Sequence, residues 1–574
     1  MQSILCTIKK QHIRCRSPIA AATHNKLGFT MRLLALTLPQ NILSSGFAIK
    51  TTSHQTWLMR FSTYFTPLAL LLLLMLLNGC ASFSGIDPQA RLSDGHTIDG
   101  RILNSSATMD ATQINAQWPT VTWWQAYRDP QLNQLVAQAI ADSPSIKIAQ
   151  ARIRQASAMA GIAEAGTLPK IGAEASLTRE LFTSDGLYPA PLGGGWDWSN
   201  DARIKASYDL DLWDKDRNTL EAALDNVHVS AAEARAAQLS LEGTVVRSYL
   251  QLATQFVLKD ITEASLAQQQ AIVNIAQRRL HAGIGTGLEV SQAETTLPTT
   301  SAAIEKINEA IALSRNQIAA LTGQGPSAGD AIQRPVLAKN MAANVSENGA
   351  DHSAEKQLAS STALPIALPD NIPANLIGRR PDVIAQRWRV ESLTKDIAVA
   401  KAGFYPNINI SAFIGFESIG LSRFLTGDST VRGFAPAISL PIFDGGRLRA
   451  NLGAQTAILD AAIETYNNTL LQSLQSVADQ IVKLKSIELQ RNQSERAMAL
   501  AEKSASLAKR GFKAGLTSYL NVIQTQMATL QEQQRVAQTR AAYLDAWAQL
   551  MQSLGGGLGD DLPHPPAAAN VAAK

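Results

Sequence analysis

The sequence predicts an α+β membrane protein in which each chain supplies four β-strands and several very long α-helices. Three observations lead to this fold class. Two long stretches, 192–297 and 442–562, contain no proline. Four segments of roughly ten residues alternate apolar and polar side chains, the period that is typical of strands. The two halves of the chain carry the same motifs in the same order, so one structural unit occurs twice.

The first proline-free stretch has the pattern of a coiled coil. From Arg217 to Leu280, apolar residues recur three and four positions apart, as in a coiled-coil seam. A helix of about 65 residues is roughly 100 Å long at 1.5 Å per residue. Its other faces are polar, so we do not expect it to cross a membrane. The seam residues are Leu220, Leu224, Val227, Ala231, Ala234, Leu241, Val245, Leu252 and Phe256.

The duplication is visible in prolines and in short motifs. Pro144 and Pro169 are 25 residues apart, as are Pro381 and Pro406. We therefore predict a first repeat over 123–322 and a second over 372–557. The paired motifs are "GIAEAGTLPKIGAEASLT" (161–178) with "AVAKAGFYPNINISAFIG" (398–415), "LDLWDKDR" (210–217) with "LPIFDGGR" (440–447), and "HAGIGTGLEVSQ" (281–292) with "KAGLTSYLNVIQ" (513–524).

Two segments outside the repeats lack any period. Residues 323–371 are polar and rich in small side chains, so we expect a linker or insertion. Residues 558–574, "LGDDLPHPPAAANVAAK", are expected to form a disordered tail.

Two strand candidates precede the long helix in each repeat. Their alternation is typical of a transmembrane β-barrel with a watery lumen, and a half-buried soluble sheet alternates in the same way. Four strands cannot close a barrel, and an open edge cannot face lipid. In a membrane, several chains would therefore share one barrel, and a trimer would supply twelve strands. The candidates are Lys170–Thr178, Arg203–Leu212, Asn407–Phe416 and Gly433–Phe443.

Charged side chains lie on the polar face of the first two candidates. They carry both signs, which argues against strong selectivity for cations or anions. The candidate lumen residues are Lys170, Glu174, Arg203, Lys205, Asp209 and Asp211.

The apolar run Leu68–Leu77 is expected to belong to a signal peptide. A helix needs about 20 residues to cross a bilayer, and this run suits the shorter apolar region of a signal sequence. Met59 and Arg60 supply a start and a positive charge just before it. We therefore expect residues 1–79 to be removed, with Met59 as the true start.

Leu77-Asn78-Gly79-Cys80 resembles a bacterial lipobox, in which the cysteine is acylated and becomes the new N-terminus. Asn78 departs from the small residue that is usual at its position. Cys80 is the last cysteine of the chain, so an internal disulfide downstream is excluded. An ordinary signal peptide with a chance cysteine is the alternative. We expect 80–122 to be a lipid-anchored extended segment in the outer membrane.

Charge and motifs exclude several functional classes. Residues 1–79 contain eight of the 51 Lys and Arg and no acidic residue, which leaves 43 basic against 47 acidic residues. This balance gives no indication of nucleic-acid binding. The eight histidines are scattered, and no nucleophile elbow, phosphate loop or zinc motif occurs. We therefore expect neither an enzyme nor a metal or other cofactor beyond the lipid on Cys80.

Six motifs occur between residue 123 and residue 557. They are "WWQAYRDPQLNQLVAQAI" (123–140), "YDLDLWDKDR" (208–217), "RRPD" (379–382), "AKAGFYPNINI" (400–410), "LPIFDGGRLRANL" (440–452) and "GGG" (555–557). Together, and in this order, they resemble the TolC-type outer membrane factors, specifically the efflux lipoproteins that serve resistance–nodulation–division pumps.

The resemblance implies a homotrimeric channel-tunnel. Four strands per chain would form a shared twelve-strand barrel among outer-membrane lipids, and an α-helical coiled-coil barrel would continue it through the periplasm. A periplasmic adaptor and an inner-membrane pump would dock below, and small molecules would pass without chemistry. A channel for type I protein secretion and a structural lipoprotein that spaces the envelope are the alternatives.

The resemblance also assigns residues to roles. The turns at 281–289 and 511–521 would form the periplasmic tip, with Glu289, Asn521 and Gln524 at the aperture. Only Glu289 is acidic where the family often has acids. Two further groups are expected to be structural: Arg379, Arg380, Pro381 and Asp382 at a helix start, and Asp444, Gly445 and Gly446 at a strand-to-helix connection.

Overall fold

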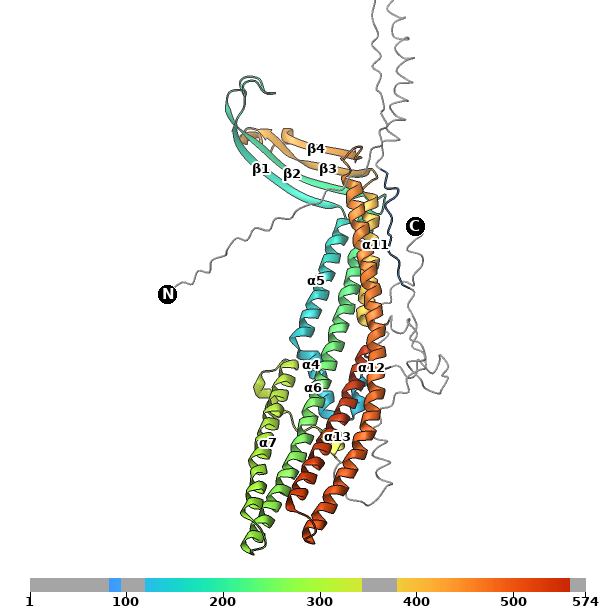
Figure 1. Cartoon of the computed structure of the whole chain (residues 1–574). Coiled ribbons are helices and arrows are strands. Elements are labelled where there is room, and N and C mark those ends of the chain that lie inside the picture. The colour runs from blue at the N-terminus through green and yellow to red at the C-terminus, as the bar shows by residue number, and fades with distance from the viewer. Residues whose placement is uncertain (1–81, 94–118, 343–378, 558–574) are drawn as a thin grey trace, which may run out of the picture. The chain divides into compact units, whose positions relative to one another are not determined.

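The computed structural model describes residues 82–93, 119–342 and 379–557 (Figure 1). All of them belong to one compact unit, 74–574, which is separate from residues 1–73. Cys80, the expected signal region 1–79 and the expected tail 558–574 lie outside these described residues.

The order of elements repeats, as the sequence predicts. Each copy runs helix, strand, strand, long helix, shorter helix. The long helices have 67 residues each and the shorter ones 35 each. The first copy is η1 (Trp123–Tyr127), α4 (Pro130–Asp142), α5 (Pro144–Gly166), β1 (Lys170–Leu181), β2 (Trp196–Leu210), α6 (Lys215–His281) and α7 (Gly287–Leu321). The second copy is α11 (Pro381–Ala402), β3 (Asn407–Ile419), η3 (Leu421–Arg423), η4 (Gly427–Ser429), β4 (Thr430–Ser439), α12 (Arg447–Lys513) and α13 (Tyr519–Ser553).

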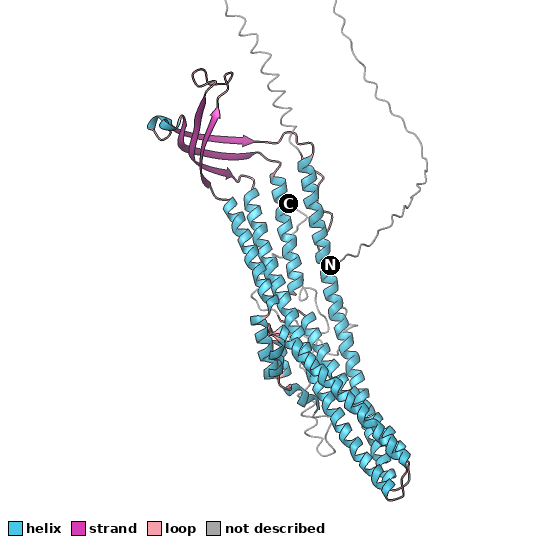
Figure 2. Cartoon of the chain, turned by 90° about the vertical axis from the view of Figure 1, so that its left-hand side faces the viewer, coloured by secondary structure: helices cyan, strands magenta, loops and turns pink. Residues whose placement is uncertain are grey.

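The helices of the two copies share one apolar core. It joins α4, α6, α12 and α13 through side chains that include Leu132, Val245, Tyr249, Val477 and Met551. Figures 1 and 2 show the sheet at one end of the long helices and the α6–α7 and α12–α13 turns at the other. Within the described ranges, no helix combines the length and the apolar character that a bilayer crossing requires.

The four strands form one antiparallel sheet in the order β1-β2-β3-β4. Glu174 lies opposite Arg203, and Lys205 lies opposite Gly172 on one side and Phe413 on the other. Side chains of one parity therefore share a polar face, and those of the other parity, such as Ile204 and Ile414, share an apolar face. The alternation predicted from the sequence is confirmed.

Some strand ends differ from the prediction. β1 and β3 begin at the predicted residues, Lys170 and Asn407, but extend to Leu181 and Ile419. β2 begins at Trp196, well before the predicted Arg203, because its pairing with β1 continues to the loop between them. β4 ends at Ser439 instead of Phe443, because its partner β3 begins at Asn407, directly opposite Ser439.

The first part of 323–371, the segment expected to be a linker or insertion, contains two short helices. Residues Pro326–Ala331 form η2 and Val336–Ala342 form α8. Ile332, Leu337, Ala338 and Met341 are buried in the main core. The apolar side chains of this segment are too few and too close together to show a helical period in the sequence. Residues 343–371 lie outside the described residues.

Asp129 connects this segment to the first repeat. Its side chain is 1% exposed. Oδ1 accepts a hydrogen bond from the backbone N–H of Gln131 at 3.1 Å, which caps α4. Oδ2 accepts one from the backbone N–H of Leu337 at 3.1 Å, at the start of α8. Burial, with the Asp129 carboxylate next to it, holds the pKa of Tyr249 well above its ordinary value. One carboxylate thus joins two helix starts.

Candidate functional site: the polar sheet face and the helix tips

The polar sheet face carries charges that neutralise one another across strands. Five of the six candidate lumen residues lie on it: Lys170, Glu174, Arg203, Lys205 and Asp209. Lys205 forms an ion pair with Glu174, and Nη2 of Arg203 lies 2.6 Å from Oε2 of Glu417. Asp209 accepts a hydrogen bond from Asn409 at 2.9 Å. Because these charges are paired, the polar face is hydrated but has no strong positive or negative electrostatic potential.

Asp211, the sixth candidate, has a different position. It lies beyond the end of β2, and its Oδ2 accepts a hydrogen bond from the backbone N–H of Arg217 at 2.8 Å. It therefore binds an unsatisfied donor in the first turn of α6 and is not a strand residue of the polar face.

Phe413 is an aromatic side chain on the polar face that the sequence analysis did not select. Its ring lies 5.2 Å from the Arg203 guanidinium. A Cβ at Gly433 would stand 2.5 Å from the ring, so any side chain there would push the ring out of its present position. The signal was present in the sequence, because alternation places Phe413 among the polar positions.

Asp444, Gly445 and Gly446 connect the sheet to α12, as predicted. Oδ2 of Asp444 accepts from the backbone N–H of Leu448 at 2.8 Å and Oδ1 from that of Gly446 at 3.0 Å. These bonds hold the pKa of the Asp444 carboxyl below its ordinary value. Both glycines have positive φ, +67° and +89°, which a side chain would disfavour.

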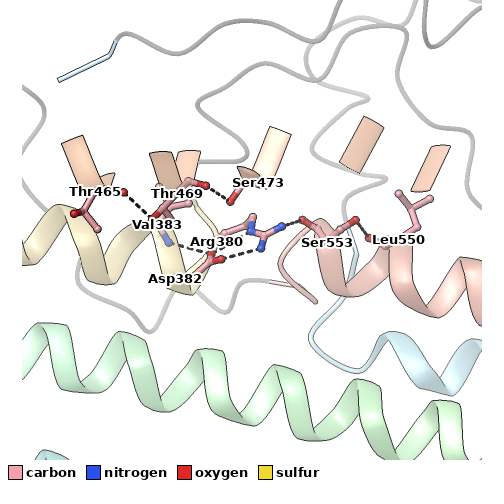
Figure 3. Close-up of polar contacts among 8 residues, drawn as sticks. All are labelled: Arg380, Asp382, Val383, Thr465, Thr469, Ser473, Leu550 and Ser553. Carbon is pink, nitrogen blue, oxygen red and sulfur yellow. Dashed lines mark hydrogen bonds and ion pairs between the residues drawn. The ribbon is translucent and has the colours of Figure 1, made fainter. Parts of the chain in front are cut away.

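The "RRPD" residues build a helix start, and Arg380 reaches the end of another helix (Figure 3). Pro381 is the first residue of α11 and Arg380 its N-cap. The Arg380 guanidinium donates to both carboxylate oxygens of Asp382, at 3.1 and 2.8 Å, and to the carbonyl oxygen of Ser553 at 2.5 Å. The structure therefore joins the start of α11 to the last turn of α13. Arg379 is exposed.

At the opposite end, the two long helices end in similar turns. α6 ends at His281 and α12 at Lys513, each followed by Ala and a glycine with positive φ. This is the helix termination that the sequence predicts. Ile284, Leu288, Leu516 and Leu520 are exposed on the turns.

The three aperture candidates lie close to these turns. Glu289 is in the first turn of α7, and its backbone N–H donates to Oγ1 of the N-cap Thr286 at 3.3 Å. Nδ2 of Asn521 donates to Oγ1 of Thr517 at 2.6 Å, within its own turn. Gln524 is exposed. Their positions are compatible with an aperture, but the bonds of Glu289 and Asn521 are local.

Residues 82–93, which follow Cys80 closely, lie along α12. Oδ1 of Asp460 accepts from the backbone N–H groups of Gln89 and Ala90, both at 2.9 Å. Asn467 accepts from the N–H of Ser93 at 2.8 Å. The Phe83 and Phe404 rings meet edge to face, 5.7 Å apart. Side chains of α12 thus bind the backbone of this segment, which has neither helix nor strand.

The part of the chain that the structure describes contains no group of three or more His, Cys, Asp and Glu side chains that could hold a metal ion. The candidate site consists of the polar sheet face at one end of the helices and the turns at the other.

Comparison with known proteins identifies the family. The family model for outer membrane efflux proteins matches residues 135–324 and 372–556. The fusaric acid resistance protein FusA of Burkholderia cepacia is 40% identical over 396 residues, 68% of this chain and 69% of FusA. The multidrug resistance outer membrane protein MdtP of Escherichia coli K12 is 28% identical over 460 residues, 78% of this chain and 88% of MdtP.

A solved structure supports the same family. The outer membrane protein VceC of Vibrio cholerae superimposes with a TM-score of 0.67 at 30% sequence identity, covering 77% of this chain and all of VceC. The resemblance that the motifs predict is confirmed, together with the outer-membrane location. The duplicated helix–strand pattern and the two-faced sheet agree with these matches. The chain belongs to the outer membrane efflux protein family.

Proposed function

We propose that three copies of this chain form one channel, in which three four-stranded sheets close a twelve-strand barrel and the long helices continue it as a periplasmic tube. The observation that carries the proposal is the sheet itself. It has one polar and one apolar face, and β1 and β4 are its two edges. An edge exposed to lipid would leave backbone groups without partners, and pairing β4 of one copy with β1 of the next removes both edges.

Such a channel would let small molecules leave the periplasm passively. The paired charges of the polar face support a lumen without strong charge selectivity. An inner-membrane pump would supply the energy. The pump and a periplasmic adaptor would dock near the helix tips, with Glu289, Asn521 and Gln524 at the aperture. No observation on the described residues favours a protein-secretion channel or an envelope spacer. The two-faced sheet argues against the spacer, which would not need one.

Single-channel recording tests this function. Purified protein, with its mass in detergent measured by light scattering, is added to a planar bilayer. We expect a trimer and discrete conductance steps that differ little between cation-rich and anion-rich gradients. A monomer that never conducts at any voltage would contradict the proposal, and a conducting dimer or tetramer would contradict its stoichiometry.

Cys80 is proposed as the lipid anchor, and 80–122 as the segment that follows it. Two or more acyl chains hold a protein on a membrane far longer than one. We expect Cys80→Ser to abolish incorporation of radioactive palmitate and to leave the fold intact, because residues 82–93 are held by side chains of α12. Cys6→Ser is the control, since Cys6 lies in the segment expected to be removed. Palmitate that persists on the Cys80→Ser protein would refute the anchor.

A further inference from the structure

The duplication relates a contact inside one chain to a contact between two copies. In the sheet, β2 of the first repeat pairs with β3 of the second. The counterpart of β2 is β4, since each leads into a long helix, and the counterpart of β3 is β1. These counterparts are the two edges of the sheet. In a ring of copies, the seam between β4 of one copy and β1 of the next is therefore equivalent to the β2–β3 pair.

The repeated motifs fix which residues correspond. "LDLWDKDR" (210–217) aligns with "LPIFDGGR" (440–447), so the counterpart of a β2 residue lies 230 positions later. "GIAEAGTLPKIGAEASLT" (161–178) aligns with "AVAKAGFYPNINISAFIG" (398–415), so the counterpart of a β3 residue lies 237 positions earlier. Phe443 is thus the counterpart of Trp213, and Leu168 is the counterpart of Tyr405.

Trp213 and Tyr405 close the joint between the two repeats at the helix end of the sheet. Their ring centroids lie 4.5 Å apart and their planes are 17° apart, a stacked arrangement. Nε1 of Trp213 also donates to the carbonyl oxygen of Pro406 at 2.8 Å. The junction of β2 with α6 is therefore packed against the junction of α11 with β3.

The counterparts of these two residues are uncovered. Phe443 is 91% exposed and Leu168 is 57% exposed. The same holds beside the sheet, where Ile148 of α5 is 56% exposed. Its counterpart, Ala385 of α11, is 2% exposed and lies in a cluster with residues of α6. Positions that are packed inside the chain are apolar but uncovered at its edges, as expected of a surface that a second copy covers.

The observed β2–β3 register can be transferred to the seam. Lys205 lies opposite Phe413, and their counterparts are Ala435 and Ser176. On the apolar face, Ile204 lies opposite Ile414. The counterparts of this second pair are Phe434 of β4 and Leu177 of β1.

We propose that β4 of one copy pairs antiparallel with β1 of the next in this register, and that Phe443 of one copy packs on Leu168 of the next. Ala435 then lies opposite Ser176 on the polar face, and Phe434 lies opposite Leu177 on the apolar face. The inference rests on the proposed trimeric channel and specifies the residues at which its copies meet.

The two faces of the sheet restrict the possible registers. A shift by one residue would set apolar-face side chains of β4 opposite polar-face side chains of β1, so it is excluded. A shift by two keeps the faces. The two hairpins of the chain differ by such a shift, because Lys170 lies opposite Ser207 and its counterpart Asn407 lies opposite Ser439. Only the unshifted seam sets Phe443 against Leu168 as Trp213 is set against Tyr405.

Disulfide cross-linking tests the register. The double variant Ala435→Cys with Ser176→Cys is oxidised in detergent and run on a denaturing gel without reductant. Directly opposite side chains have Cβ atoms about 5 Å apart, close to disulfide reach. In one chain β1 and β4 are three strand spacings apart, about 14 Å, so a bond must join two copies. We expect the band to shift from monomer to trimer and to return to monomer with reductant.

Two further double variants represent the registers shifted by two residues. They are Ala437→Cys with Ser176→Cys and Ala437→Cys with Gly172→Cys. In the proposed register these pairs lie about 7 Å apart at Cβ, too far for a disulfide, so both should stay monomeric on the gel. Each single-cysteine variant should stay monomeric too, because the chain has no cysteine after Cys80. Light scattering before oxidation checks that every variant is still a trimer.

Truncation tests the contact of Phe443 with Leu168. Phe443→Ala and Leu168→Ala should each lower the temperature at which the trimer dissociates on a gel without boiling. Because both remove one contact, the double variant should dissociate at no lower temperature than the more affected single variant. Leu187→Ala is the control, since Leu187 is 96% exposed in the loop between β1 and β2, at the other end of the strands. It should leave the dissociation temperature unchanged.

The outcomes are distinct. A wild-type protein that is monomeric and never conducts contradicts the channel function itself. A conducting trimer in which a shifted pair forms the cross-link in place of Ala435 and Ser176 overturns the register. A conducting trimer in which no pair forms a cross-link overturns the β4–β1 seam. Unchanged dissociation in Phe443→Ala and Leu168→Ala, or additive effects in the double variant, overturns their contact.

Discussion

Replacing Gly415 by alanine is expected to prevent β3 from pairing with β2. A Cβ at this position would lie 2.0 Å from the carbonyl oxygen of Ala202 and 2.7 Å from the Cα of Arg203. These are backbone atoms of the neighbouring strand, so no side-chain rotation can relieve the contact. We expect a cost of about 3 kcal/mol, the upper end for overpacked sites, which corresponds to roughly a 100-fold loss of the assembled form.

Gly172→Ala is the matched control for this prediction. Gly172 also lies in a strand and on the polar face, opposite Lys205, and a Cβ there would meet nothing within 4 Å. Both variants are compared by the fraction of heat-modifiable oligomer on a gel without boiling. If Gly415→Ala assembles as well as Gly172→Ala, the close approach of β3 to β2 is not a constraint on the fold.

Replacing Asp129 by alanine should release α8 from the first repeat. The change removes the cap of α4, which typically costs about 1 kcal/mol. It also leaves the buried N–H of Leu337 without a partner, for about 1 to 3 kcal/mol more. We expect amides of 336–341 to exchange with solvent up to about 100-fold faster, the factor that corresponds to about 3 kcal/mol. Hydrogen exchange with mass spectrometry measures this directly.

Asp142→Ala provides the comparison at the other end of α4. The Asp142 side chain is 55% exposed and lies 3.9 Å from the Lys147 amine, so its loss should change stability by less than about 0.5 kcal/mol. Asp129→Asn keeps one acceptor oxygen and should fall between the two. Unchanged exchange in α8 of the Asp129→Ala protein would show that the buried apolar side chains of the segment hold it without the carboxylate.

The sequence predicted the architecture well because its signals are local or repeated. Both long helices follow from apolar spacing and the absence of proline, and the two sheet faces follow from alternation. β4 was predicted to end too late because alternation continues through Ile442, whereas the pairing with β3 stops at Ser439, opposite the first residue of β3. Asp129 could have been found, since an acid directly before Pro130 is a helix-start signal.

The contacts at the tip could not be predicted in the same way. The guanidinium carbon of Arg279 in α6 lies 4.8 Å from the centroid of the Phe512 ring in α12, and the two residues belong to different repeats. Their meeting depends on how two helices of 67 residues pack over their whole length. Family resemblance pointed to Glu289 and Asn521 because it compares positions along the chain. This comparison carries no information on which side chains of α6 and α7 face α12 and α13.

The open edges β1 and β4 have a genetic consequence. If each barrel contains three chains, one defective chain prevents the barrel from closing, because every sheet must pair with both of its neighbours. In a cell that makes equal amounts of a normal chain and one whose edge cannot pair, random assembly leaves about one trimer in eight entirely normal. An edge mutation of this protein would therefore act dominantly over the intact gene, whereas loss of the gene product altogether would be recessive.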